Sequence, residues 1–85
     1  MINQELLNIL ACPETHQDLI LADAKLVEQI NRLIAQGTLL NRANEIILKK
    51  IDGGLVRHDR KYLYPVREDI PVLLIDEAIA LEKIG

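Results

Sequence analysis

The sequence predicts an α+β domain in which a small antiparallel sheet of three to four strands packs with an N-terminal helix, an inserted central helix and a short C-terminal helix. Three observations support this fold class. An aliphatic stripe with helical spacing follows Asp23. Short β-type segments separated by turn residues fill the second half. The length of 85 residues suits a single domain and is too short for two.

The first helix is predicted near the start of the chain. Asn3 can cap it, and Ile2 and Leu7 flank that cap at the spacing of a hydrophobic staple. Its apolar stripe consists of Leu6, Leu7 and Leu10. Cys12-Pro13 ends the helix, because a residue before proline is pushed out of the α region.

A short strand over 18–21 precedes the clearest helix of the chain. Asp23 is its expected N-cap and Gly37 its expected C-terminal stop. Five aliphatic side chains between these two residues share one face, which we expect to be buried: Leu26, Val27, Ile30, Leu33 and Ile34.

The signal weakens over 38–52. Residues 45–51 could form a strand, and 41–44 resemble a loop. The pair Gly53-Gly54 suggests a turn or bulge.

The C-terminal third predicts a hairpin of 55–57 and 62–66 around residues 58–61. A second turn at 67–69 leads to a strand over 70–75. Pro71 lacks an N–H, so it must lie at the start of that strand or face its free edge. Asp76 is a plausible cap for a last short helix through Leu81.

Composition excludes several classes of protein. The chain is 49% hydrophobic with a net charge of −3, which is typical of a globular protein and unlike most nucleic-acid-binding domains. A local basic cluster is interrupted by acidic residues, so no direct nucleic-acid partner is expected; its members are Arg57, Arg60, Lys61 and Arg67. The start lacks signal-peptide features, and no apolar run approaches the roughly 20 residues that span a bilayer. A single cysteine, Cys12, fits a reducing compartment, so we expect a cytoplasmic protein.

Two blocks of sequence resemble a known family. Residues 6–13 (LLNILACP) resemble the opening of the bacterial YcaR-type proteins, which belong to the wider family of the tRNA-methyltransferase activator Trm112. Residues 54–57 (GLVR) and 62–74 (YLYPVREDIPVLL) resemble that family's Tyr-Pro-(Ile/Val)-Arg-Asp-Gly-Ile-Pro-Val-(Leu/Met)-Leu hallmark. Relative to the shortest members, 25–52 is an insertion within the single domain 1–85. Asp69 stands where the family usually has glycine, and we expect the turn to survive because aspartate tolerates left-handed backbone.

The resemblance implies a zinc-binding site at four positions of this chain, but only one of them, Cys12, is a zinc ligand. The matching positions are Cys12, Thr15, Arg57 and Arg60. A guanidinium stays protonated and has no lone pair for zinc, so we expect neither metal nor cofactor. We expect the two arginines to reach towards Glu14 or Asp18, and the central helix to compensate for the lost metal. A weaker alternative is a metal or redox site of Cys12, His16 and His58.

The resemblance implies a non-catalytic protein-binding module. Eukaryotic and archaeal members stabilise and activate S-adenosylmethionine-dependent methyltransferases, partly through an apolar surface and a strand edge. The candidate partner surface is Tyr62, Tyr64, Ile70 and Val72. An alternative is a structural protein that forms a homodimer through the same strand edge. Cys12 and His16 could form a thiol–imidazole pair that Asp18 orients. The resemblance instead explains Cys12 as a remnant of the zinc site, so no enzyme is predicted.

Overall fold

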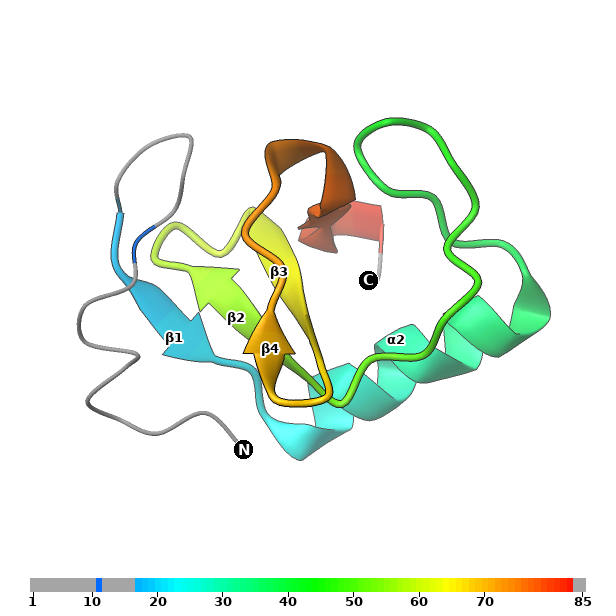
Figure 1. Ribbon diagram of the computed structural model, residues 1–85, viewed down its shortest axis with the longest axis horizontal. Coiled ribbons are helices and arrows are strands. Elements are labelled where there is room, and N and C mark those ends of the chain that lie inside the picture. Colours follow the sequence, from blue (N-terminus) through cyan, green and yellow to red (C-terminus); the bar gives the residue numbers. More distant parts are fainter. Residues whose placement is uncertain (1–10, 12–16, 84–85) are drawn as a thin grey trace.

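The computed structural model describes residue 11 and residues 17–83 (Figure 1). The described residues form a five-stranded antiparallel sheet and one α-helix. The elements are β1 (Leu19–Leu21), α2 (Ala24–Gln36), β2 (Gly53–Arg57), β3 (Tyr62–Arg67), β4 (Ile70–Pro71) and β5 (Ile79–Ala80). The α+β class is therefore confirmed. The predicted N-terminal helix falls on residues outside the described part of the chain.

The central helix has both of its predicted ends. The Asp23 side chain accepts a hydrogen bond from the Leu26 N–H at 2.8 Å, and Gly37 takes up a left-handed φ of 72° after the last turn. Ile30 and Ile34 are buried, whereas Leu26, Val27 and Leu33 are half-buried beside them. The predicted stripe therefore faces the core, with its centre deeper than its flanks.

The sheet is built around the predicted hairpin of β2 and β3. Its strand order is β1-β2-β3-β4, and β5 also pairs with β3. Two strands thus share the outer edge of β3: β4 pairs with Val66 and Arg67, and β5 pairs with Tyr62 and Leu63.

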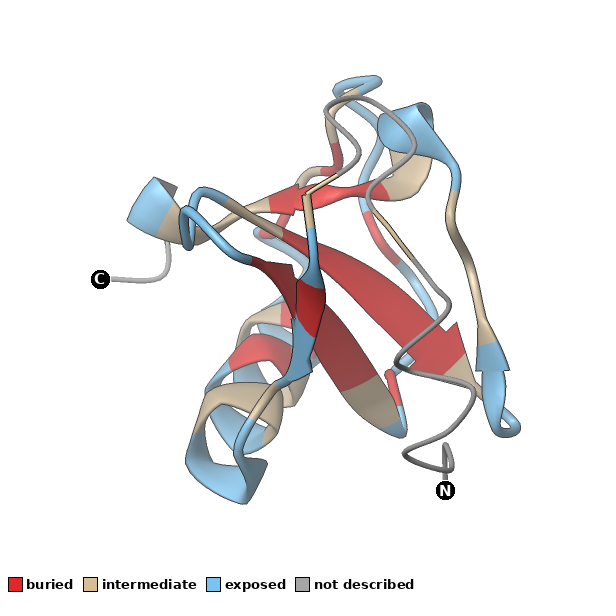
Figure 2. Cartoon of the chain, turned by 90° about the vertical axis from the view of Figure 1, so that its left-hand side faces the viewer, coloured by how far each residue is buried: buried red, intermediate tan, exposed pale blue. Residues whose placement is uncertain are grey.

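Alternation along the strands divides the core into two clusters, one on each face of the sheet. On one face, Val56, Leu63 and Ile79 pack with Ile30 and Ile34 of the helix. Aliphatic residues of the loop after the helix complete this cluster: Leu39, Ile47 and Ile51. The other face carries Leu19, Leu55, Tyr64, Val66 and Ala78. Figure 2 shows the buried residues concentrated along the two long central strands, with α2 turning its exposed side away from the sheet.

The strand suggested over 45–51 does not form. One isolated bridge, Leu40 with Ile46, is present in this segment. The Asn31 side chain instead bonds both backbone groups of Ile51, at 2.7 Å to its N–H and 2.8 Å to its carbonyl. A side chain of α2 therefore fixes the end of this loop, in the segment where the sequence suggested a strand. The pair Gly53-Gly54 is likewise not a turn, since it opens β2.

The strand predicted over 70–75 ends early. The Val72 N–H donates to the Pro65 carbonyl at 2.8 Å, but Pro65 has no N–H to return to Val72, so the β3–β4 ladder stops there. Because Val72 points its N–H at β3, the nitrogen of Pro71 faces the free edge, as predicted. Glu68 and Asp69 form the tight turn before β4 with φ values of 52° and 61°. The turn therefore survives without glycine.

The helix predicted from Asp76 to Leu81 is wrong. Residues Ile75–Glu77 and Leu81–Lys83 form two short 3₁₀ turns, and β5 lies between them. Ile79 is fully buried opposite Leu63, so burial against β3 holds this segment extended where a capping signal had suggested a helix. No helix in the described part of the chain is long and apolar enough to cross a membrane.

Candidate functional site

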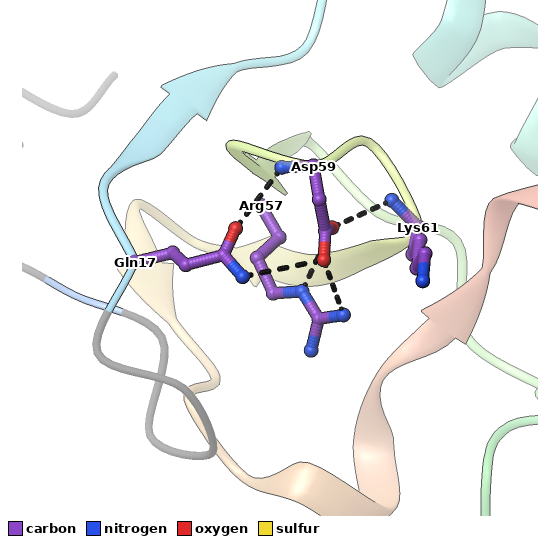
Figure 3. Close-up of polar contacts among 4 residues, drawn as sticks. All are labelled: Gln17, Arg57, Asp59 and Lys61. Carbon is purple, nitrogen blue, oxygen red and sulfur yellow. Dashed lines mark hydrogen bonds and ion pairs between the residues drawn. The ribbon is translucent and has the colours of Figure 1, made fainter.

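An ion pair holds the hairpin loop between β2 and β3, where the family resemblance places two of the four zinc-site positions. The Arg57 side chain, at the end of β2, is buried although it is charged. Its Nε and Nη2 donate to the two carboxylate oxygens of Asp59 at 2.9 and 2.6 Å (Figure 3). Two parallel N–H···O bonds of this kind fix orientation as well as charge.

Asp59 connects this pair to two other parts of the chain. Gln17, just before β1, donates from Nε2 to the carboxylate at 3.3 Å and accepts from the Asp59 N–H at 3.1 Å. The Lys61 N–H donates to the same carboxylate at 3.0 Å. The hydrogen bond from Arg57, with those from Lys61 and Gln17, holds the pKa of the Asp59 carboxyl well below its usual range against a smaller opposing effect of desolvation.

The structure places two of the four zinc-site positions. Arg57 binds Asp59, a contact that the sequence expectation of Glu14 or Asp18 did not include. Arg60 is exposed in the hairpin turn at φ 62°, and its N–H donates to the Arg57 carbonyl at 2.7 Å. Asp18 accepts a hydrogen bond through its backbone carbonyl, from the His58 N–H at 3.0 Å. Cys12, Thr15, His16 and Glu14 lie outside the described residues.

A metal-ligand cluster is not found among the residues that the structure describes, where no group of three or more His, Cys, Asp or Glu side chains is close enough together to hold an ion. His58 is exposed in the hairpin turn.

Tyr62 contacts two guanidinium groups. The central carbon of Arg42 lies 4.3 Å from the centroid of its ring, and that of Arg57 lies 4.9 Å from it. Cation–π contacts at these distances are attractive. Sequence reasoning missed Arg42, since nothing in the loop 38–52 indicates that it returns to β3.

The four residues of the candidate partner surface do not form one patch. Cross-strand partners share a face of a sheet, and alternate residues lie on opposite faces. Tyr62 and Tyr64 share the face of Leu55, and Tyr64 is fully buried in the core. Ile70 pairs with Arg67 and therefore lies on the opposite face, as does Val72. The structure thus separates the tyrosines from the aliphatic pair.

The segment from β4 to the first 3₁₀ turn carries several exposed aliphatic side chains. Ile70 is 63% exposed and Leu74 is 61% exposed, with Ile75 less so. Leu73, between them, packs against the cluster of Leu55 and Tyr64. The segment is therefore anchored by one side chain while its neighbours face solvent.

These features define a small α+β domain with a hydrogen-bonded hairpin loop and with exposed aliphatic side chains in the segment from β4 to the first 3₁₀ turn. A family model described as Trm112p-like protein matches residues 3–69, so the chain belongs to the Trm112p-like family. It is also similar to the solution NMR structure of XF2673 from Xylella fastidiosa, with 34% sequence identity and a TM-score of 0.76. That match covers 99% of this chain and 87% of the other. None of the curated proteins matches the chain. The resemblance stated from the sequence is confirmed.

Proposed function

We propose that this protein is a non-catalytic partner that binds, and so stabilises or activates, an S-adenosylmethionine-dependent methyltransferase. Membership of the Trm112p-like family supports a partner module of this kind. The observation that carries the proposal within this chain is the pair of exposed aliphatic side chains Ile70 and Leu74 beside the sheet edge.

Burial of these two side chains by a partner is favourable. Transfer of an exposed Ile or Leu side chain out of water contributes roughly 1.5–3 kcal/mol. Leu73 holds the segment against the core, so little conformational freedom is lost when a partner binds. A preorganised aliphatic edge is therefore a suitable docking element.

The outer edge of β4 limits how a partner strand could join the sheet. Pro71 faces this edge without an N–H, so a joining strand finds a carbonyl acceptor there and no donor. We therefore expect side-chain burial at Ile70 and Leu74 to contribute more to binding than a continuous backbone ladder.

Co-expression of the tagged chain with each of the host's methyltransferases tests the proposal. We expect one of them to co-purify, and Leu74→Asp to abolish its capture because a buried unpaired charge at an interface is costly. Ile20→Asp is the matched control: Ile20 is 43% exposed in β1, at the opposite end of the strand order from β4, so the same change there should leave capture unchanged.

The competing homodimer gives a different result. If no methyltransferase co-purifies while the chain elutes as a dimer that Leu74→Asp dissociates, the edge serves self-association and the proposed function is wrong. Capture that survives Leu74→Asp would instead remove this edge from the interface.

A further inference from the structure

The family resemblance places the four zinc-site positions in two parts of the chain. Cys12 and Thr15 precede β1, whereas Arg57 ends β2 and Arg60 lies in the turn that follows it. A metal ion with ligands from both parts would link the segment before β1 to the β2–β3 hairpin. A different link between these two parts is present in this chain.

The surroundings of Arg57 do not fit a metal ion. Its side chain is buried and stays protonated, so a cation held beside it would meet a like charge. Its Nε and Nη2 donate to Asp59, and the central carbon of its guanidinium lies 4.9 Å from the centroid of the Tyr62 ring. A position that the resemblance gives to a metal ligand is therefore held by a buried cation, which needs an anion beside it.

The carboxylate of Asp59 supplies this anion and also reaches the segment before β1 (Figure 3). Its Oδ1 accepts from Arg57 Nε at 2.9 Å and from the Lys61 N–H at 3.0 Å. Its Oδ2 accepts from Arg57 Nη2 at 2.6 Å and from Gln17 Nε2 at 3.3 Å. Gln17 Oε1 in turn accepts from the Asp59 N–H at 3.1 Å, so the two residues exchange hydrogen bonds although they are 42 positions apart.

We propose that Gln17, Arg57 and Asp59 form a clasp that replaces the family's metal ion as the link between the segment before β1 and the β2–β3 hairpin. The charges are reversed relative to a metal site. A metal ion is a central cation surrounded by electron-pair donors, whereas the clasp has a central carboxylate surrounded by N–H donors. The clasp contains no ion, so it makes this link independent of a supply of zinc. This inference does not depend on the proposed function.

The clasp lies at the end of the β1–β2 pairing. The His58 N–H donates to the Asp18 carbonyl at 3.0 Å, next to the strand pair Leu19 and Arg57. Because β1 is only three residues long, an added link from Gln17 should restrain the opening of this end. Exchange of the His58 N–H with solvent therefore reports on the clasp.

Amide hydrogen exchange, followed by NMR on the full chain, tests the proposal. Gln17→Met removes both hydrogen bonds to Asp59 and keeps the length of the side chain. The His58 N–H should then exchange at least about fivefold faster, the effect of losing one net hydrogen bond. The Ile30 N–H, in the buried stripe of α2, should keep its rate because the clasp is local. Gln29→Met is the matched control: Gln29 is exposed on α2, so this change should leave both rates unaltered.

A double-mutant cycle tests whether Gln17 and Asp59 act together. Asp59→Asn alone should accelerate exchange at His58 and at Lys61, whose N–H the carboxylate accepts. In the Asp59→Asn background, Gln17→Met should accelerate His58 less than it does in the wild type, because the contact between the two side chains is already weakened.

Three results would overturn the proposal. An unchanged rate at His58 in Gln17→Met would mean that Asp59 braces only its own hairpin. Effects of the two substitutions that simply add would mean that Gln17 and Asp59 act separately. An equal acceleration at Ile30 would mean that Gln17→Met lowers the stability of the whole domain instead of releasing a local link.

Discussion

Gly54 of β2 lies directly against the side chain of Leu63 in β3. A Cβ built on Gly54 would come within 2.6 Å of the Leu63 Cδ1 atom and 2.8 Å of its Cγ. Leu63 is itself fully buried, in the same core cluster as Ile30 and Ile79. The packing of the two central strands therefore requires glycine at position 54. From the sequence alone, the pair Gly53-Gly54 had suggested a turn or bulge.

This contact predicts opposite results for two adjacent glycines. Gly54→Ala should lower the free energy of unfolding by about 1–3 kcal/mol, the usual effect of overpacking a core. Gly53→Ala, with ordinary contact distance to Val66, should change it by less than about 1 kcal/mol. Urea denaturation of both variants measures the difference. Equal effects would mean that Leu63 adjusts freely.

Ile30 connects the helix to the sheet, and its truncation should destabilise the domain. Ile30 is fully buried, so Ile30→Ala should cost roughly 2–5 kcal/mol. Ile46→Ala removes the same atoms from a side chain that is 53% exposed, and should cost no more than about 1 kcal/mol. Thermal denaturation compares them; similar costs would show that α2 contributes little to the core.

The ion pair of Arg57 and Asp59 should make stability depend on pH. Because the Asp59 pKa is lower in the folded chain, chiefly through the hydrogen bond from Arg57, its ionised form favours folding. That contribution is complete above the unfolded-state pKa of about 4 and is lost as the pH falls below it. Asp59→Asn should therefore lower the melting temperature at pH 7, and this difference should shrink near pH 2.

The wild type and the Asp59→Asn variant share every other carboxylate, so general acid destabilisation cancels when their melting temperatures are compared. A difference in melting temperature that stays constant across this pH range would show that the charge of Asp59 does not contribute through its ionisation.

The purified protein should contain no stoichiometric zinc. Arg57 and Arg60 occupy positions where the family resemblance places ligands, and a guanidinium offers no lone pair. Arg57 is also bonded through Nε and Nη2 to Asp59. Elemental analysis should find well below one zinc per chain, and a chelator should leave the melting temperature unchanged. One zinc per chain, with unfolding by the chelator, would contradict the prediction.

The sequence alone determined the central helix, the hairpin of β2 and β3, and the family of this protein. The helix was defined by its N-cap Asp23, by its C-terminal stop Gly37 and by the aliphatic stripe around Ile30 between them, because capping and periodicity act within one element. The hairpin of β2 and β3 and the turn at Glu68 and Asp69 were predicted for the same reason. Only the tertiary structure decided features that depend on contacts between distant segments. Asn31 fixes the backbone of Ile51, Pro65 ends the pairing of β4, and burial beside Leu63 makes a strand of the segment predicted as a helix. The separation of Tyr64 from Ile70 also follows from strand register, which alternates faces with each residue and is set by pairing across the sheet.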